Sequence, residues 1–216
     1  MIFEKIIKLI SSKITALDWV EVYGGTARMH REKVSSGDFG DIYKKYPISC
    51  EISGDVPTGC VVGKFRSLVP NSRYKSLLYW ELISSLSDSG AFKGTESTRV
   101  LKGTARLIGF INQSKFGSTD CNVVADAQLA LWKVLNDILK YPDFPIENGQ
   151  LCIRVKGEVP REELFSKYDY QPIEHTFFYP FDVFGLDVNF ELILPLGCIP
   201  EFTFEPEICV DFNTVS

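Results

Sequence analysis

Hydrophobic residues at the start of the chain recur at helical spacing. Lys5 and Lys8 fall on the opposite face and interrupt the apolar run that a secretory signal would need. The segment therefore predicts a folded amphipathic helix, and a strand with alternating side chains is expected over residues 18–23, ended by Gly24 and Gly25. The residues on the apolar face, three or four positions apart, are Phe3, Ile6, Ile7, Ile10, Ile14 and Leu17.

A second and clearer helix is predicted over residues 118–140. Ser118 or Thr119 can cap its first turn, and Pro142 stops it shortly after its end. Its apolar face consists of Val124, Ala127, Leu131, Val134, Leu135 and Ile138.

Alternating and β-branched residues predict the strands. Segments 74–86 and 97–112 are separated by the turn-rich stretch SDSGAFKGTE, which predicts one large hairpin over residues 74–112. We expect this hairpin to project beyond the compact sheet or to pair with an adjacent subunit, because a small core cannot cover such long strands on both faces. Further strands are expected at 46–53, 150–159, 174–185 and 186–196.

The polar stretch 28–45 lacks apolar periodicity, and it is expected to form a long exposed loop. Together these elements predict an α+β fold: an antiparallel-rich mixed sheet packed against two main helices, with a long β-hairpin and an extended C-terminal arm. Residues 1–156 are expected to form the core. Residues 157–216 are expected to form an aromatic, acidic C-terminal extension.

Composition limits the possible classes of protein. A chain of 216 residues with 45% hydrophobic content can bury a core, and no stretch approaches the roughly 18 consecutive apolar residues that cross a bilayer. We therefore expect no membrane contact. Single cysteines without a C-x-x-C pair, and histidines far from them in sequence, predict free buried thiols and no metal site: Cys50, Cys60, Cys121, Cys152, Cys198 and Cys209.

Catalytic motifs are not convincing. Asp38-Phe39-Gly40 matches the kinase triplet without the other kinase motifs, and Gly63-Lys64 is followed by Phe65 rather than by Ser or Thr. The sequence predicts no catalytic residue and no cofactor. One alternative remains open, a small cytosolic enzyme whose site is assembled from the scattered residues His30, Asp38, Asp41 and His175.

Charge is unevenly distributed along the chain. Residues 61–116 contain nine Lys and Arg against three acids, whereas residues 181–216 contain seven acids and no Lys or Arg. The asymmetry is either an accident of solvated faces or a complementary pair of surfaces on neighbouring copies, with Arg99, Lys102 and Arg106 as interface residues. A monomeric binding module for an acidic ligand is a further alternative. The net charge of −5 argues against general nucleic-acid binding.

The C-terminal segment alternates apolar and acidic residues. It must close the protein's own sheet or lie on a partner as an added strand, because it would otherwise expose a large apolar surface. We expect an extended arm that docks on another subunit or a neighbouring protein, through Phe202, Phe204, Ile208, Val210 and Phe212.

The order of these elements resembles a known family. A short helix leading into LDWVEVYGG, a charged loop, the YPISCEI strand, a long hairpin and the VVADAQLALWKVLNDIL helix are similar to the tail-terminator and head–tail joining (neck ring) proteins of tailed bacteriophages. The resemblance covers about residues 1–156. It implies a structural virion protein without catalytic residues.

The resemblance also implies how such a protein works. Protomers join into a homo-oligomeric ring through sheet extension and loop contacts, and DNA passes through the lumen. The ring lies at the tail end or the neck of the virion, against neck, portal or tail-tube proteins, and it assembles in the cytoplasm of the bacterial host.

Overall fold

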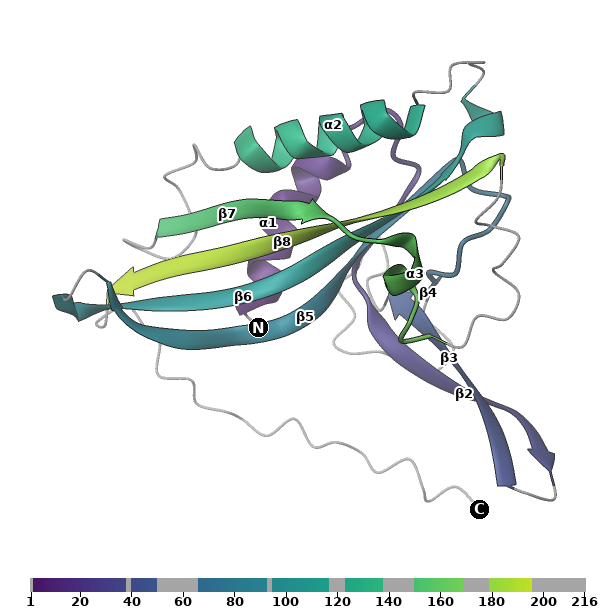
Figure 1. Cartoon of the computed structure of the whole chain (residues 1–216), viewed down its shortest axis with the longest axis horizontal. Helices are drawn as coiled ribbons and strands as arrows, with labels where there is room; N and C mark the ends of the chain where they lie inside the picture. Colours follow the sequence, from purple (N-terminus) through teal and green to yellow (C-terminus); the bar gives the residue numbers. More distant parts are fainter. Residues whose placement is uncertain are drawn as a thin grey trace.

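A computed structural model describes residues 2–37, 40–49, 66–92, 95–116, 123–137, 150–168 and 179–195, and all structural statements below concern these residues. Among the described residues, the first element is a helix and the last is a long strand (Figure 1). The elements are α1 (Ile2–Ile14), β1 (Val22–Thr26), β2 (Arg28–Gly37), β3 (Gly40–Ser49), β4 (Arg66–Ser67), β5 (Ser76–Phe92), β6 (Thr95–Asn112), the short 3-10 helix η1 (Gln113–Lys115), α2 (Val123–Asp137), β7 (Gln150–Glu158), α3 (Arg161–Leu164) and β8 (Phe181–Pro195).

The main sheet has five strands in the order β1-β5-β6-β8-β7. β1 runs parallel to β5, and every other neighbouring pair is antiparallel. The longest ladder joins β6 to β8 without a register shift, from Thr98 opposite Pro195 to Asn112 opposite Phe181. The predicted α+β class with an antiparallel-rich mixed sheet is confirmed.

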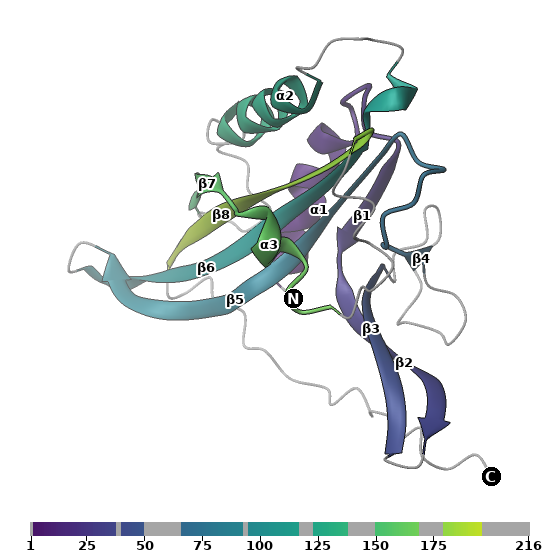
Figure 2. The same cartoon turned by 45° about the vertical axis from the view of Figure 1, so that its right-hand side comes forward.

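Helices α1 and α2 lie on one face of this sheet (Figure 2), and their apolar side chains share one core with it. The apolar face of α1 that the sequence predicts is buried from Phe3 to Ile14, and the Phe3 ring meets Phe190 of β8 edge-on at 5.6 Å between centroids. Trp80 of β5 and Leu131 of α2 are fully buried in the same cluster. Both main helices are thus held by apolar burial, the dominant stabilising term in a core.

The opposite face of the sheet has a smaller apolar cluster, confined to one half of the strands. Leu68, which follows β4, and Leu164 of α3 cover Tyr79, Ile108 and Phe110 there. Gly24 of β1 lies under Leu68: a Cβ at this position would come within 2.5 Å of Leu68 Cδ2. The prediction that Gly24 and Gly25 end the strand is wrong, because both lie within β1.

The predicted loop over residues 28–45 is wrong. Residues of β2 and β3 pair in antiparallel register from Arg28 opposite Ile48 to Gly37 opposite Gly40, and β4 adds a short third strand. This β2–β3 hairpin projects away from the main sheet (Figure 1 and Figure 2). Because most of its side chains face solvent on both sides, the sequence carries no alternation of apolar and polar residues to reveal it.

The boundary expected between residues 156 and 157 also needs correction. It falls inside β7, and β8 from the expected extension lies between β6 and β7. Even-numbered residues of β8 from Phe184 to Leu194 are buried in the helix-side core. Residues up to Pro195 therefore belong to the core sheet, because β7 reaches the other strands only through β8.

The long hairpin predicted over residues 74–112 is confirmed as β5 and β6. Its two strands differ in their surroundings. β6 is flanked by β8 along its length, whereas β5 is buried from Ser76 to Glu81 and largely exposed from Ile83 onward. The strands predicted at 150–159 and 186–196 correspond to β7 and to most of β8. None of the helices in the described ranges is long and apolar enough to span a membrane.

Candidate functional site: the polar half of the sheet

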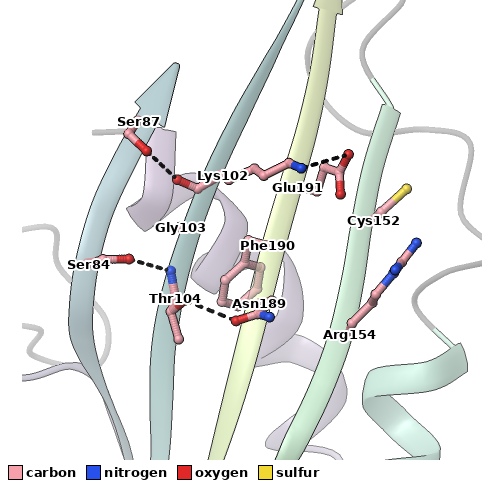
Figure 3. Close-up of a pocket in the computed structure, with 10 residues that line it drawn as sticks. All are labelled: Ser84, Ser87, Lys102, Gly103, Thr104, Cys152, Arg154, Asn189, Phe190 and Glu191. Atoms are coloured by element: carbon pink, nitrogen blue, oxygen red, sulfur yellow. Dashed lines mark hydrogen bonds and ion pairs between the residues drawn. The ribbon is translucent and has the colours of Figure 1, made fainter. Parts of the chain in front are cut away.

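The face of the sheet opposite α1 and α2 changes from apolar to polar along β6. Side chains two positions apart on a strand share a face, so Phe110 and Ile108 of the apolar cluster are followed on this face by Arg106, Thr104 and Lys102. The polar half contains an open hollow of about 430 Å³. Its lining includes Ser84, Ser87, Lys102, Thr104, Cys152, Arg154, Asn189 and Glu191 (Figure 3).

Rows of polar side chains cross the strands in this hollow, as the strand register requires. In one row, the Thr104 backbone N–H donates to Ser84 Oγ at 3.0 Å, and the Thr104 hydroxyl donates to Asn189 Oδ1 at 3.0 Å. In the next row, Lys102 Nζ lies 3.9 Å from Glu191 Oε1 (Figure 3). The register places Arg154 and Cys152 of β7 beside Asn189 and Glu191.

The border between the apolar and polar halves is a buried ion pair. Arg106 Nε donates to Asp187 Oδ1 at 2.8 Å, and Arg106 Nη2 donates to Asp187 Oδ2 at 3.2 Å. The two side chains are only 11% and 20% exposed. The hydrogen bonds to Asp187 raise the pKa of the Arg106 guanidinium further, so Arg106 stays positively charged.

Glu81 lies opposite Arg106 on β5 and completes this row. Burial raises the pKa of the Glu81 carboxyl, against the opposing effects of a hydrogen bond from the Tyr168 hydroxyl and the positive charge of Lys167. Lys167 Nζ lies 3.9 Å from the second carboxylate oxygen of Glu81. Glu81 therefore ties the segment after α3 to the sheet, and its covered carboxyl is poorly placed to act on a substrate.

The lining of the hollow consists of groups that can bind a ligand by hydrogen bonds and charge. It presents hydroxyls, an amide and charged groups on an open sheet surface. Within the part of the chain that the structure describes, no group of three or more His, Cys, Asp or Glu could hold a metal ion. Cys152, the one cysteine among the described residues, is a half-buried free thiol.

The three basic residues expected at an interface each lie beside an acid of their own chain. Arg99 Nε is 3.8 Å from Asp88 Oδ2, Lys102 faces Glu191, and Arg106 is bound to Asp187. Two of these acids belong to the acidic segment 181–216. Basic and acidic segments that are far apart in the sequence thus partly neutralise each other between adjacent strands of one sheet. This outcome was not predicted, because it depends on strand register.

Other expected site residues lie far apart or outside the described ranges. His30 packs edge-on against Tyr46 in the β2–β3 hairpin, whereas Asp41 lies opposite Ser36, nearer the hairpin tip. Asp38 and His175 lie outside the described residues, as do five of the six cysteines. The same holds for the interface residues predicted in the C-terminal arm, Phe202, Phe204, Ile208, Val210 and Phe212.

The sequence pattern did not indicate that Glu81, Tyr168 and Asp187 belong to this site. Glu81 and Tyr168 are 87 positions apart, and no local pattern relates them. An acid within the apolar stretch YKSLLYWELISSL was the one available signal, because a charged residue in a buried strand requires a partner.

Comparison with known proteins adds no family to this description. No family model, no curated protein and no solved structure matches this chain.

Proposed function

We propose that this chain is a structural virion protein of a tailed bacteriophage. It forms an oligomeric ring at the tail end or the head–tail junction, and DNA passes through the ring. The order of elements in the sequence suggests this role. The observation that carries it is an open edge of the main sheet.

The open edge is the outer half of β5. β1 pairs with β5 only near its start, through Leu77, Leu78 and Trp80. From Leu82 to Phe92, β5 pairs with β6 alone among the described strands, and Ile83 on this stretch is 39% exposed. A long strand with one unpaired side can accept a strand from another copy, and this sheet extension would join protomers in a ring.

The projecting β2–β3 hairpin supports the same function. It reaches away from the main sheet (Figure 2), and it exposes Met29 by 52% and Val34 by 61%. β4 pairs only with Ile48 and Ser49 of β3, so the projecting part of the hairpin is two-stranded. A monomer gains little from such a ribbon, since isolated hairpins are at best marginally stable. In a ring, such a hairpin would contact the next protomer or an axial neighbour.

Native mass spectrometry and negative-stain imaging of the purified chain, alone and with candidate neck and tail-tube proteins, test this function. We expect closed rings in the assembled particle, whereas the isolated protein can remain monomeric before assembly. A strict monomer both in isolation and in assembled particles would overturn the proposal.

A further inference from the structure

The β2–β3 hairpin has one face with excess positive charge. Residues that lie opposite each other in an antiparallel pair share a face, so the register defines the two faces. One face carries Arg31, Lys33 and Lys45 against a single acid, Asp41, and we name it the basic face. Asp41 Oδ1 lies 2.8 Å from Lys33 Nζ and therefore neutralises Lys33 rather than the other two cations.

The other face of the hairpin is electrically balanced. Arg28 Nη2 lies 3.5 Å from Glu4 Oε1 of α1, and Lys44 lies opposite Glu32. The Tyr46 hydroxyl donates to Glu32 Oε2 at 3.0 Å on the same face. Adjacent residues Lys44 and Lys45 thus lie on differently charged faces, which makes them a matched pair for experiments.

Aromatic and apolar groups accompany the charges of the basic face. The Arg31 guanidinium carbon lies 3.8 Å from the centroid of the Tyr43 ring, which holds the guanidinium in a defined position. Met29, on the same face, is half exposed. A ligand with both negative charge and apolar side chains would match this face better than a phosphate backbone, which supplies charge alone.

The chain itself contains a segment of that composition. Residues 196–216, which follow β8, include four acids and no Lys or Arg, together with three Phe. The cations of β6 could have formed ion pairs with these four acids, but they already lie beside Asp88, Asp187 and Glu191. We propose that residues 196–216 bind the basic face of the β2–β3 hairpin through Arg31 and Lys45.

Zero-length carbodiimide coupling of the full chain, followed by chymotryptic digestion and mass spectrometry, tests this. The reagent joins a Lys amine to a carboxylate in direct contact with it. We expect Lys45 to couple to Glu201, Glu205, Glu207 or Asp211, and Lys44 to couple to these acids several-fold less. Coupling of Lys33 to Asp41 shows that the reagent reaches the hairpin.

Two charge reversals provide matched controls. Arg31→Glu should lower the coupling of Lys45 to the segment by about two- to five-fold, the range expected for loss of an exposed ion pair, whereas Lys44→Glu should leave it unchanged. Mixing chains with and without ¹⁵N label shows which copy supplies the segment. Circular dichroism of both variants checks that the fold is retained.

Absence of any coupling between Lys45 and residues 196–216, with Lys33–Asp41 coupling present, would overturn the proposal. A second result would also overturn it: duplex DNA binds the full chain, Arg31→Glu lowers that affinity, and Lys45 does not couple to residues 196–216. The inference does not depend on ring formation: coupling can be found in a monomer, and rings can form without it.

Discussion

Arg106 and Asp187 form two hydrogen bonds to each other across the neighbouring strands β6 and β8, with Arg106 Nε 2.8 Å from Asp187 Oδ1. The pair is largely buried at the border between the apolar and polar halves of one sheet face. A shift of β8 by one residue would turn Asp187 to the opposite face, so the pair holds the β6–β8 register.

Asp187→Asn should lower the free energy of unfolding by about 2 to 3 kcal/mol, because it leaves a nearly buried guanidinium without its counter-charge. Urea denaturation monitored by tryptophan fluorescence measures this change. Glu191→Gln is the matched control four residues further along β8. Its partner Lys102 is 54% exposed and 3.9 Å away, so the change should stay within ~0.5 kcal/mol. Equal losses for both variants would contradict this assignment.

Glu81→Gln should remove a pH dependence of stability. Burial raises the pKa of Glu81 above its ordinary value of 4.5, so the folded state binds this proton more tightly than the unfolded state does. The stabilising contribution is fully present below pH 4.5 and is lost as the pH rises through the folded-state pKa. The variant keeps the charged and hydrogen-bonding groups that face this carboxyl, which are Arg106, Asp187, Lys167 and Tyr168.

Gln resembles the protonated carboxyl, so the variant should match the wild type at low pH and become the more stable protein as the pH rises. Denaturant titrations at a series of pH values measure the difference. A constant difference across the series would show that Glu81 does not titrate with a raised pKa.

Gly109→Ala should destabilise the protein by about 1 to 3 kcal/mol, the usual cost of overpacking a core. A Cβ at Gly109 would lie 2.2 Å from Cζ of the buried Phe184 ring on the neighbouring strand. Thermal unfolding of Gly109→Ala, Phe184→Leu and the double variant measures their coupling. The double variant should lose less stability than the two single losses added together, because Leu leaves room for the new methyl group. Strict additivity would exclude the clash.

Ile83→Lys should block ring assembly with little effect on the protomer. The residue is partly exposed on the open stretch of β5, and a lysine on an edge strand opposes pairing with another strand. Native mass spectrometry of assembled samples measures the effect, and the melting temperature checks the fold. Leu129→Lys is the control, since Leu129 is 69% exposed on α2, away from the edge. Assembly lost with Leu129→Lys and retained with Ile83→Lys would place the contact on α2 instead.

Periodicity predicted the elements that bury one face. The apolar residues of α1 and α2 and the alternation in β7 each report contact with a core, and the structure has these elements. The β2–β3 hairpin was missed for the same reason: both of its faces meet solvent over much of its length, so neither is marked by apolar residues.

The pairs of residues in the polar site are set by strand register, which the pattern of residues along the sequence does not reveal. Lys102 and Glu191 are 89 positions apart and become neighbours only through the β6–β8 register. The uneven distribution of charge was visible, but which acid would lie beside which base was not. Residues 157–216 were assigned to an extension because the family resemblance covers only about residues 1–156, whereas β8 lies inside the sheet.

The position of β8 in the strand order also affects how the chain can fold during its synthesis. β5 and β6 are consecutive and can pair as soon as both have left the ribosome, but β7 meets no other described strand until β8 has been made. A nascent chain that has reached residue 180 therefore carries one side of β6 open along the whole stretch that β8 will occupy, and both sides of β7 open. Such unpaired strands favour association with other chains, so a translational pause before β8 would lengthen the period in which this protein needs a chaperone.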